Sequence, residues 1–564
     1  MSRGTPASGG DTAARSASLG GAGDVAPSVP HTNGRWSTWS FAAVMALFLV
    51  SRLLIYSDSA WFTADDWRLV GTRNDLDVDA LLADHNQHWV SASVLMYRAL
   101  YLMFGLNSYL PYVLTAALII AGTAYALREV MRRSGVGPWT STVVAAAFPF
   151  MCPAGGQSLA NVLLLSSLLF GLVQLLLIDR AGPWSARDWL ALIAGVAAIT
   201  SSGAGVPVLV GVGLFALIRR GWRFCVLQFL PLALLFALWW SQYAPRDDVW
   251  LPPISIGPLW DWLMSAAVGT AMAAGASTVS AVLLVVVTAS GVVALLVPDS
   301  RRSRLTEALP ALCLLAIPVV FAVFTYAGRW LLGPAAAQDS RYMALAVACV
   351  LPLVALAIDS LGQIHPALFL ALAIPWLAAA SNTVSLVQST PEQQIRVDRA
   401  RAATSATITA AAELDVPDDA PAFTGSRMGE GMGDTPVSFL RAAVASGRLD
   451  PAAWDPSPRA LDEARLRLAF YPESVTDTLP TACTPRTSVL SWPAKAGDRV
   501  VVSASPLLGL SPVNVSTLAA SGPVTTSLAP PTATTYRILA EQLDLVLAGT
   551  PEGAKYLSCP QPTS

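Results

Sequence analysis

The chain has 564 residues and a mass of 59.2 kDa; 54% of the residues are hydrophobic and only 13% are charged. Soluble domains carry about 25% charged residues, so this composition excludes a soluble enzyme, a nucleic-acid-binding protein and a disordered chain. Runs of roughly 20 apolar residues recur along the first two thirds of the sequence, which predicts a polytopic α-helical protein of the lipid bilayer. The net charge of −2 indicates no particular partner.

The first 35 residues are rich in Gly, Ala, Ser, Thr and Pro and show no apolar period, which predicts a disordered tail over residues 1–35. The apolar segment 38–56 follows this tail. Because the polar stretch before it is too long for an ordinary secretory signal, we expect segment 38–56 to remain in the protein as the first membrane span.

Apolar runs predict eleven spans in all, within a transmembrane domain over residues 36–384. The predicted spans lie at 38–56, 109–127, 138–153, 158–178, 188–203, 204–218, 224–243, 277–297, 308–328, 342–358 and 366–384. The stretch 257–275 fits either a helix that lies at the membrane interface or a twelfth span.

Arginines determine the predicted orientation. Those that gather on alternate loops are Arg128, Arg132, Arg133, Arg180, Arg187, Arg219, Arg220, Arg223, Arg301, Arg302 and Arg304. Loops rich in basic residues stay in the cytoplasm, so we expect a plasma-membrane protein whose N-terminus is cytoplasmic. With eleven spans, residues 385–564 then lie outside the cell.

Residues 385–564 contain no apolar span and are numerous enough for a domain with its own core. The stretch 392–414 predicts a long helix, and the chain from 486 onward alternates β-branched residues with turn residues. We therefore expect an extracytoplasmic α+β domain that ends in a β-sandwich-like region. Cys483 and Cys559 lie in this domain, and an oxidising compartment favours a disulfide between them, although two unrelated thiols remain the alternative.

The first external loop, residues 57–108, is the most polar stretch near the membrane. It contains the adjacent carboxylates Asp65 and Asp66, flanked by Trp61, Phe62 and Trp67. One such carboxylate can act as the general base that deprotonates a hydroxyl nucleophile. The pair can also bind a divalent cation that stabilises a leaving phosphate. The alternative is a solvated acidic turn between interfacial tryptophans.

Two of the four histidines of the chain, His85 and His88, lie in the same loop, with Trp89 directly behind them. Residues three apart share one face of a helix, so the pair fits either a metal site or a contact with a polar substrate. A metal site would combine Asp66 with His88 around Mg²⁺, Mn²⁺ or Ca²⁺. The following stretch, 90–104, is short and amphipathic, which predicts a helix on the outer membrane face.

A second polar cluster is predicted on the same side of the membrane. Arg329 ends one span, and Arg341 and Tyr342 begin the next. Guanidinium groups bind phosphate oxygens in a bidentate manner, so the cluster fits a lipid-linked phosphate. Snorkelling of arginine at helix ends is the alternative. Asp247 and Asp248 form a competing carboxylate pair in another external loop.

The order of these motifs resembles the GT-C superfamily of membrane glycosyltransferases. The residues that carry the resemblance are TADDWRLV, then HNQHWVSASVLMYRALYLMFGLNSYLPYVL, and later the GR…SRY pattern at Arg329 and Ser340–Tyr342. The resemblance covers roughly residues 38–384. The composition and the external cysteine pair fit an actinobacterial envelope, where arabinose and mannose donors are used, so the resemblance implies an arabinofuranosyl- or mannosyltransferase-like enzyme of cell-wall biogenesis.

The resemblance implies an inverting transfer from a polyprenyl-phosphate sugar to a cell-envelope glycan or protein. Asp65 or Asp66 would deprotonate the acceptor hydroxyl, and His85, His88 and Trp89 would contact the substrates. Arg329, Arg341 and Tyr342 would hold the lipid phosphate. The C-terminal domain would guide a glycan acceptor.

Two other classes of function stay open. A transporter or a scaffold that binds lipid-linked glycans is the first. A transporter needs ionisable residues in mid-span, whereas the charged residues within the predicted spans are Arg52, near an outer end, and Asp188, at the first position of its span. A polysaccharide polymerase or ligase is the second, since it shares the lipid-linked donor.

Overall fold

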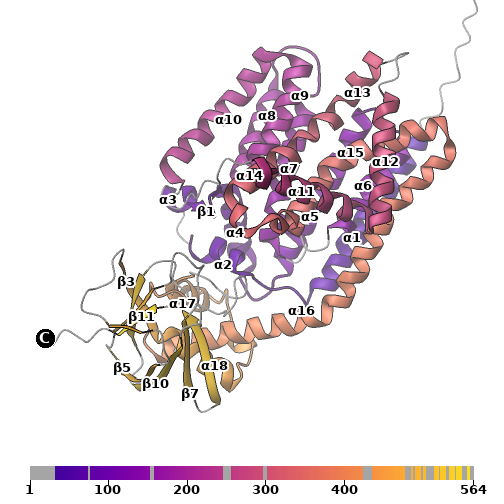
Figure 1. Ribbon diagram of the computed structural model, residues 1–564. Helices are drawn as coiled ribbons and strands as arrows, with labels where there is room; N and C mark the ends of the chain where they lie inside the picture. Colours follow the sequence, from indigo (N-terminus) through magenta and orange to yellow (C-terminus); the bar gives the residue numbers. More distant parts are fainter. Residues whose placement is uncertain are drawn as a thin grey trace, which may run out of the picture.

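The computed structural model describes residues 32–73, 77–152, 158–244, 256–295, 301–422 and 435–476, together with short strand segments between 484 and 558. A large helical bundle makes up most of the chain, and a smaller domain of helices and strands lies beyond one of its ends (Figure 1). The bundle helices are α1 (Thr32–Tyr56), α5 (Leu110–Arg133), α6 (Pro138–Met151), α7 (Leu159–Ile178), α8 (Ala186–Ser201), α9 (Gly205–Arg220), α10 (Trp222–Tyr243), α11 (Ile256–Gly275), α12 (Thr278–Leu295), α13 (Arg301–Leu314), α14 (Ala316–Arg329), α15 (Ser340–Ile364) and α16 (Ala373–Glu413).

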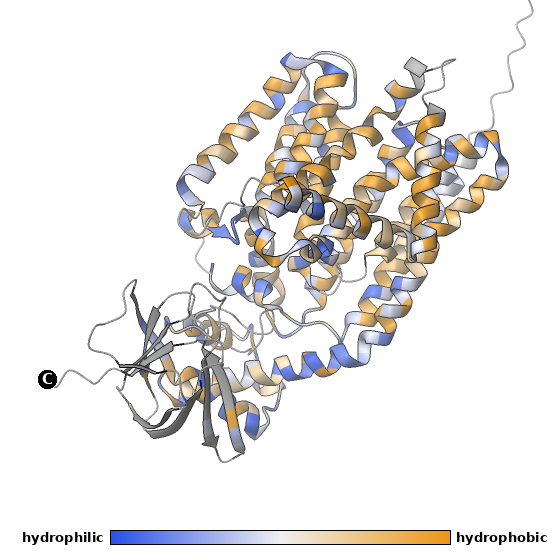
Figure 2. Ribbon diagram, viewed as in Figure 1, coloured by the Kyte–Doolittle hydropathy of each residue, from blue (hydrophilic) through white to orange (hydrophobic). Residues whose placement is uncertain are grey.

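The bundle is a polytopic membrane domain. Within the described residues, seven helices are long and apolar enough to cross a bilayer, or eight if α11 and α12 form one bent span. Helix α15 is central, because 83% of its apolar window is buried, whereas only 17% of the α10 window is. Figure 2 shows apolar residues over most bundle helices and polar residues along the part of α16 that leaves the bundle.

The predicted number of eleven spans stays a prediction. Each of the eleven ranges contains a helix, but α6, α8 and α9 have 14, 16 and 16 residues. At 1.5 Å per residue these helices are about 21 to 24 Å long, short of the roughly 30 Å of a hydrocarbon core. Helix α11 is bent by 101° against α12 and packs on the end of α14, where the Trp262 indole donates to the Thr325 hydroxyl at 3.2 Å.

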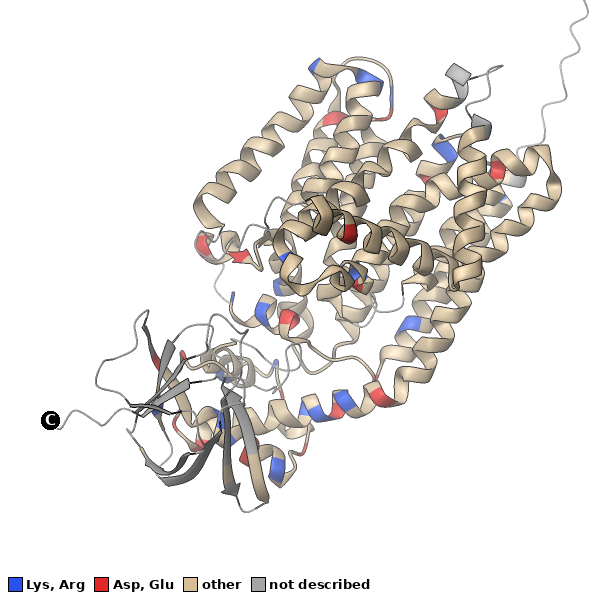
Figure 3. Ribbon diagram, viewed as in Figure 1, with Lys and Arg blue, Asp and Glu red and all other residues tan. Residues whose placement is uncertain are grey.

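One end of the bundle holds the arginine-rich loops (Figure 3). There Asp188 pairs with Arg180 and Arg220 at 2.7 and 2.5 Å, and Asp179 pairs with Arg133 and Arg219 at 3.4 and 3.5 Å. The start of α1 lies at the same end, because the Arg128 guanidinium donates to the hydroxyls of Ser37 and Thr38. These contacts agree with a common side for the N-terminus and the basic loops.

The first loop lies at the opposite end. It contains α2 (Ala64–Gly71), α3 (Val78–Leu82), the two-residue strands β1 (Asp84–His85) and β2 (His88–Trp89), and α4 (Ser91–Phe104). At 14 residues, α4 is the short apolar helix that the sequence predicts for 90–104. The expected helix around the two histidines is wrong: they lie opposite each other in an antiparallel hairpin.

The boundary predicted at residue 384 falls inside α16. The last predicted span and the predicted helix 392–414 form one helix of 41 residues, which leaves the bundle and enters the C-terminal domain. No glycine interrupts this stretch, and Pro391 lies inside the helix without ending it. The two parts of the protein are therefore connected by a continuous helix and not by a loop.

The C-terminal domain combines helices α17 (Val437–Ala445) and α18 (Pro458–Leu468) with nine strands in the described residues. The strands form two antiparallel sheets, of order β5-β10-β7-β8 and β3-β9-β6-β11-β4. Their bounds are β3 (Phe470–Thr476), β4 (Thr484–Arg486), β5 (Leu490–Lys495), β6 (Arg499–Ser503), β7 (Val513–Ala519), β8 (Gly522–Leu528), β9 (Ala533–Ile538), β10 (Gln542–Ala548) and β11 (Lys555–Ser558). Two such sheets are what a sandwich requires; the sandwich itself stays a prediction.

The C-terminal domain packs against the back of the first loop. The Leu106 amide donates to the Arg448 carbonyl at 2.7 Å, and the Thr435 hydroxyl donates to the Trp67 carbonyl at 3.3 Å. The rings of Trp61 and Trp454 meet edge to face at 4.9 Å. The first loop is thus held between the bundle and the C-terminal domain.

Candidate functional site

Helix α2 separates the two adjacent aspartates. Thr63 is its N-cap and Asp66 its third residue, and the Thr63 amide and hydroxyl donate to Oδ2 of Asp66 at 2.8 and 2.7 Å. This reciprocal arrangement is a capping box, which satisfies donors at the start of a helix. It turns Asp66 into the protein, while Asp65, one residue earlier, lies on another side of the helix.

Asp66 is fully buried in a polar network. The hydroxyls of Tyr97 and Tyr109 donate to Oδ1, and the Ser158 hydroxyl donates to Oδ2 at 3.1 Å. Burial raises the pKa of Asp66, while the hydrogen bonds from Tyr97 and Thr63 oppose this shift. Both oxygens of Asp66 already accept hydrogen bonds from protein groups. The prediction that Asp66 is a catalytic base or a metal ligand therefore finds no support in the structure.

Asp65 faces a cavity instead. Its side chain is 34% exposed, and its Oδ1 lies 3.7 Å from Nε2 of His85. The contact with His85 lowers the pKa of Asp65 below its usual value, burial opposes this, and the charges of Arg341 and Arg68 add to the lowering. Asp65 is thus a charged, accessible carboxylate at neutral pH.

The histidine hairpin, residues 84–89, brings His85 and His88 to the same cavity. His85 pairs with His88 across the two strands, and the turn residues Asn86 and Gln87 have φ of 51° and 67°. Positive φ at both central residues is typical of the tight type I′ turn. Burial lowers the pKa of His88 to about 4, and the charges of Arg329, His85 and Arg341 add to the effect. His88 is therefore neutral at physiological pH.

Two arginines reach the cavity from the other side. Arg329 ends α14 and Arg341 lies in the first turn of α15; the 3₁₀ turns Trp330–Leu332 and Pro334–Gln338 connect these helices. Both guanidinium groups lie over the ring of Tyr342, at 6.0 and 5.4 Å from its centroid. Arg341 also pairs with Asp339 at 3.4 Å, whereas Arg329 makes no ion pair with any residue that the structure describes.

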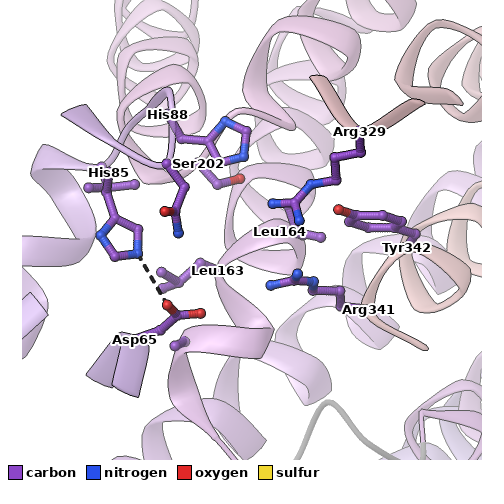
Figure 4. A pocket seen from close by; sticks show the side chains of 12 residues that line it. Asp65, His85, His88, Leu163, Leu164, Ser202, Arg329, Arg341 and Tyr342 are labelled. Atoms are coloured by element: carbon purple, nitrogen blue, oxygen red, sulfur yellow. Dashed lines mark ion pairs between the residues drawn. The ribbon is translucent and has the colours of Figure 1, made fainter. Parts of the chain in front are cut away.

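These side chains line one cavity of about 490 Å³, a volume that includes its open mouth. Figure 4 shows Asp65 and His85 on one side, Arg329, Arg341 and Tyr342 on the other, and His88 between them. The structure thus brings together six residues that the sequence singled out, from two distant parts of the chain, the first loop and the junction of α14 with α15: Asp65, His85, His88, Arg329, Arg341 and Tyr342.

Other lining residues were missed by sequence reasoning. Ser202 lies in the turn between α8 and α9, and Asn86 lies at the tip of the histidine hairpin. Apolar side chains complete the wall: Val90, Ala160, Leu163 and Leu164. The polar run Thr200–Gly203 between two apolar segments was the available signal for Ser202.

Trp89 was predicted to bind substrate but does not line the cavity. Its ring is buried and stacks on Trp239 at 5.3 Å, nearly parallel, and its Nε1 donates to the Ser91 hydroxyl at 2.6 Å. Alternation along the strand turns Trp89 away from the side that His88 faces. Trp89 therefore fastens the hairpin to α10.

A metal site does not emerge from the described part of the chain: no three His, Cys, Asp or Glu side chains there are placed to hold an ion. Asp247 and Asp248, the competing carboxylates, lie outside the described residues, as do Cys483 and Cys559. The nearest described neighbours of the two cysteines, Thr484 and Ser558, face each other across strands β4 and β11.

Comparisons with known proteins give one structural likeness. No protein-family model and no curated protein matches the chain. The solved structure of ArnT from Cupriavidus metallidurans bound to undecaprenyl phosphate is similar over 76% of this chain and 90% of that chain, at 13% sequence identity and a TM-score of 0.43. A likeness at this TM-score is too low to support a shared fold, so the function must be argued from the site itself.

Proposed function

We propose that the protein is an inverting glycosyltransferase of the GT-C type, which transfers a sugar from a polyprenyl-phosphate donor to an acceptor hydroxyl on the outer face of the membrane. The observation that carries the proposal is the polarity of the cavity. A single accessible carboxylate, Asp65, stands opposite two arginines, Arg329 and Arg341. A transfer that displaces a phosphate needs a base at one end and positive charge at the other.

Asp65 is the base in this mechanism. The acceptor hydroxyl gives its proton to the carboxylate, and its oxygen forms a bond to the anomeric carbon of the donor. The bond between that carbon and the phosphate oxygen breaks, and its electron pair leaves with the lipid phosphate. His85, 3.7 Å from Asp65, orients the carboxylate and keeps it ionised.

Arg329 and Arg341 hold the phosphate. The negative charge that develops on the leaving oxygen is stabilised by guanidinium donors already in place. Arg329 suits this role because no carboxylate among the described residues neutralises it, and a guanidinium in a partly closed cavity favours an anionic ligand.

The arginine-rich loops support an external position for the cavity. They lie at the end of the bundle opposite the first loop, which borders the cavity, and basic loops stay in the cytoplasm. The cavity then opens to the outside, where a lipid-linked donor replaces a nucleotide sugar. An arabinofuranosyl or mannosyl donor and a cell-envelope glycan or protein acceptor are the substrates that the sequence resemblance suggests.

Sugar transfer by the purified protein in liposomes tests the proposal. Wild type, Asp65→Asn and Arg329→Ala are assayed with a panel of polyprenyl-phosphate sugars, with and without EDTA. We expect wild type to transfer one donor, Asp65→Asn to lose at least 100-fold in kcat, roughly the value of general-base catalysis, and Arg329→Ala to lose affinity for the donor.

The controls separate the other classes of function. Donor binding without turnover by wild type would contradict the transferase and favour a scaffold. Transport of a lipid-linked sugar across the liposome bilayer would favour a transporter. Lengthening of the glycan on the donor lipid itself would favour a polymerase or ligase. Loss of transfer with EDTA would show that a divalent cation is required.

A further inference from the structure

Gly203 lies directly behind the His88 imidazole. It belongs to the turn between α8 and α9, next to Ser202, which lines the cavity. A Cβ on Gly203 would lie 2.7 Å from Cε1 and 3.0 Å from Cγ of His88, and closer still to Nδ1. No side chain larger than hydrogen fits between this turn and the ring.

The backbone of Gly203 does not itself demand glycine. Its φ is not in the left-handed region, in contrast to Gly221 with φ of 84°. Glycine is needed here for close approach, and the group that approaches is a side chain of the cavity. Gly205 differs in this respect, because a Cβ there would clash with the backbone of Ala198 and not with a side chain of the cavity.

The ring that Gly203 supports lines the cavity between its two sides. His88 lies between the Asp65 side and the arginines (Figure 4). In the proposed reaction, the sugar of the donor lies in this interval, because the phosphate lies at the arginines and the acceptor at Asp65. A neutral imidazole offers one donor and one acceptor nitrogen, which suits a sugar hydroxyl.

We propose that Gly203 is a positioning residue, which seats the His88 imidazole against the α8–α9 turn so that the ring hydrogen bonds a hydroxyl of the donor sugar. This inference rests on the proposed function. A methyl group at residue 203 pushes the ring forward, into the space that the sugar occupies.

A double-mutant cycle tests the inference. Gly203→Ala and His88→Ala are each expected to lower kcat/KM about tenfold, the loss of roughly one hydrogen bond. The double variant should equal His88→Ala alone, because no ring remains for the methyl group to displace. Gly257→Ala is the matched control, since nothing lies within 4 Å of a Cβ there.

Binding separates a sugar contact from a folding defect. Gly203→Ala should weaken binding of the sugar-bearing donor about tenfold and leave the affinity for unglycosylated polyprenyl phosphate unchanged. Equal weakening of both ligands, additive effects in the cycle, or a Gly203→Ala variant like wild type would each overturn the inference while wild type still transfers sugar. If wild type neither transfers nor binds any donor, the proposed function fails and the sugar contact fails with it.

Discussion

Asp65 and Asp66 are neighbours with opposite surroundings. Asp65 is a third exposed, contacts His85 and lines the cavity. Asp66 accepts hydrogen bonds from six protein groups, among them Tyr97, Tyr109 and Ser158. Replacement of Asp66 should therefore lower the stability of the protein, whereas replacement of Asp65 should affect its activity.

We expect Asp66→Ala to destabilise the protein by roughly 3 kcal/mol or more, because it leaves several buried donors without an acceptor. Asp65→Asn should leave the unfolding midpoint within about 1 °C of wild type while it abolishes transfer. Thermal unfolding in detergent, followed by tryptophan fluorescence, measures both variants. Equal midpoints for the two would contradict this assignment.

The pH dependence should report the contact between His85 and Asp65. A base must be unprotonated, so kcat/KM falls as the pH drops through the pKa of Asp65, which lies below the usual 3.8. His85→Gln removes the group that contributes most to this lowering of the pKa, so the acidic limb of the profile should move to higher pH. Profiles of kcat/KM for wild type and His85→Gln check this, and identical acidic limbs would refute the role of His85.

Residue types in the sequence singled out the first loop and both arginines, which line the cavity. They did not predict the direction in which each side chain points. The adjacent aspartates are interchangeable on spacing alone; the capping box with Thr63 distinguishes them only once the start of α2 is known. The spacing of three positions between the histidines suggested a helix. In the structure Asn86 and Gln87, which lie between them, adopt positive φ without the glycine that is usual in such a turn.

At the scale of elements, the contact between α2 and the C-terminal domain is tight. A Cβ on Gly71 would lie 2.5 Å from Cγ2 of Thr435 and 3.2 Å from the Phe439 ring. Thr435 also bonds the Trp67 carbonyl, in the middle of the helix that bears Asp65. The domain thus supports the first loop from behind.

Gly71→Ala should force α2 and the C-terminal domain apart and lower the free energy of unfolding by about 1 to 3 kcal/mol, the usual loss on overpacking. Adding Thr435→Ala removes the atoms that clash and should restore most of the stability. Limited proteolysis and the unfolding midpoint measure the single and double variants, with Gly257→Ala as the control. An unchanged unfolding midpoint for Gly71→Ala would contradict a tight contact between α2 and the C-terminal domain.

Helix positions were predicted better than helix ends. Every apolar range contains a helix, because hydrophobic runs of this length have no other stable state in lipid. The end of the last span could not be predicted, since α16 continues for about 29 residues past 384 as its composition changes from apolar to polar. The length of α16 depends on packing against the C-terminal domain, and the hydropathy of a local sequence segment carries no information about such contacts.

At the scale of the whole molecule, a disulfide between Cys483 and Cys559 stays a prediction. Thr484 and Ser558, adjacent in sequence to the two cysteines, are paired in register, which supports it. We expect a disulfide in protein from an oxidising compartment, which protects both cysteines from alkylation until it is reduced. Peptide mapping by mass spectrometry before and after reduction detects it. Alkylation of both thiols without reduction would contradict the disulfide.

Helix α4 lies outside the long spans, yet it leaves Leu102, Met103 and Phe104 between 49% and 65% exposed. Apolar side chains of this size rest in the headgroup region of a bilayer. We expect the cavity bordered by this loop to lie level with the lipid phosphates, so that the proposed donor would reach Arg329 by lateral diffusion within its leaflet. Turnover should accordingly follow the mole fraction of donor in the membrane and not its bulk concentration: diluting the donor with inert lipid slows the enzyme, and diluting the vesicles with buffer does not.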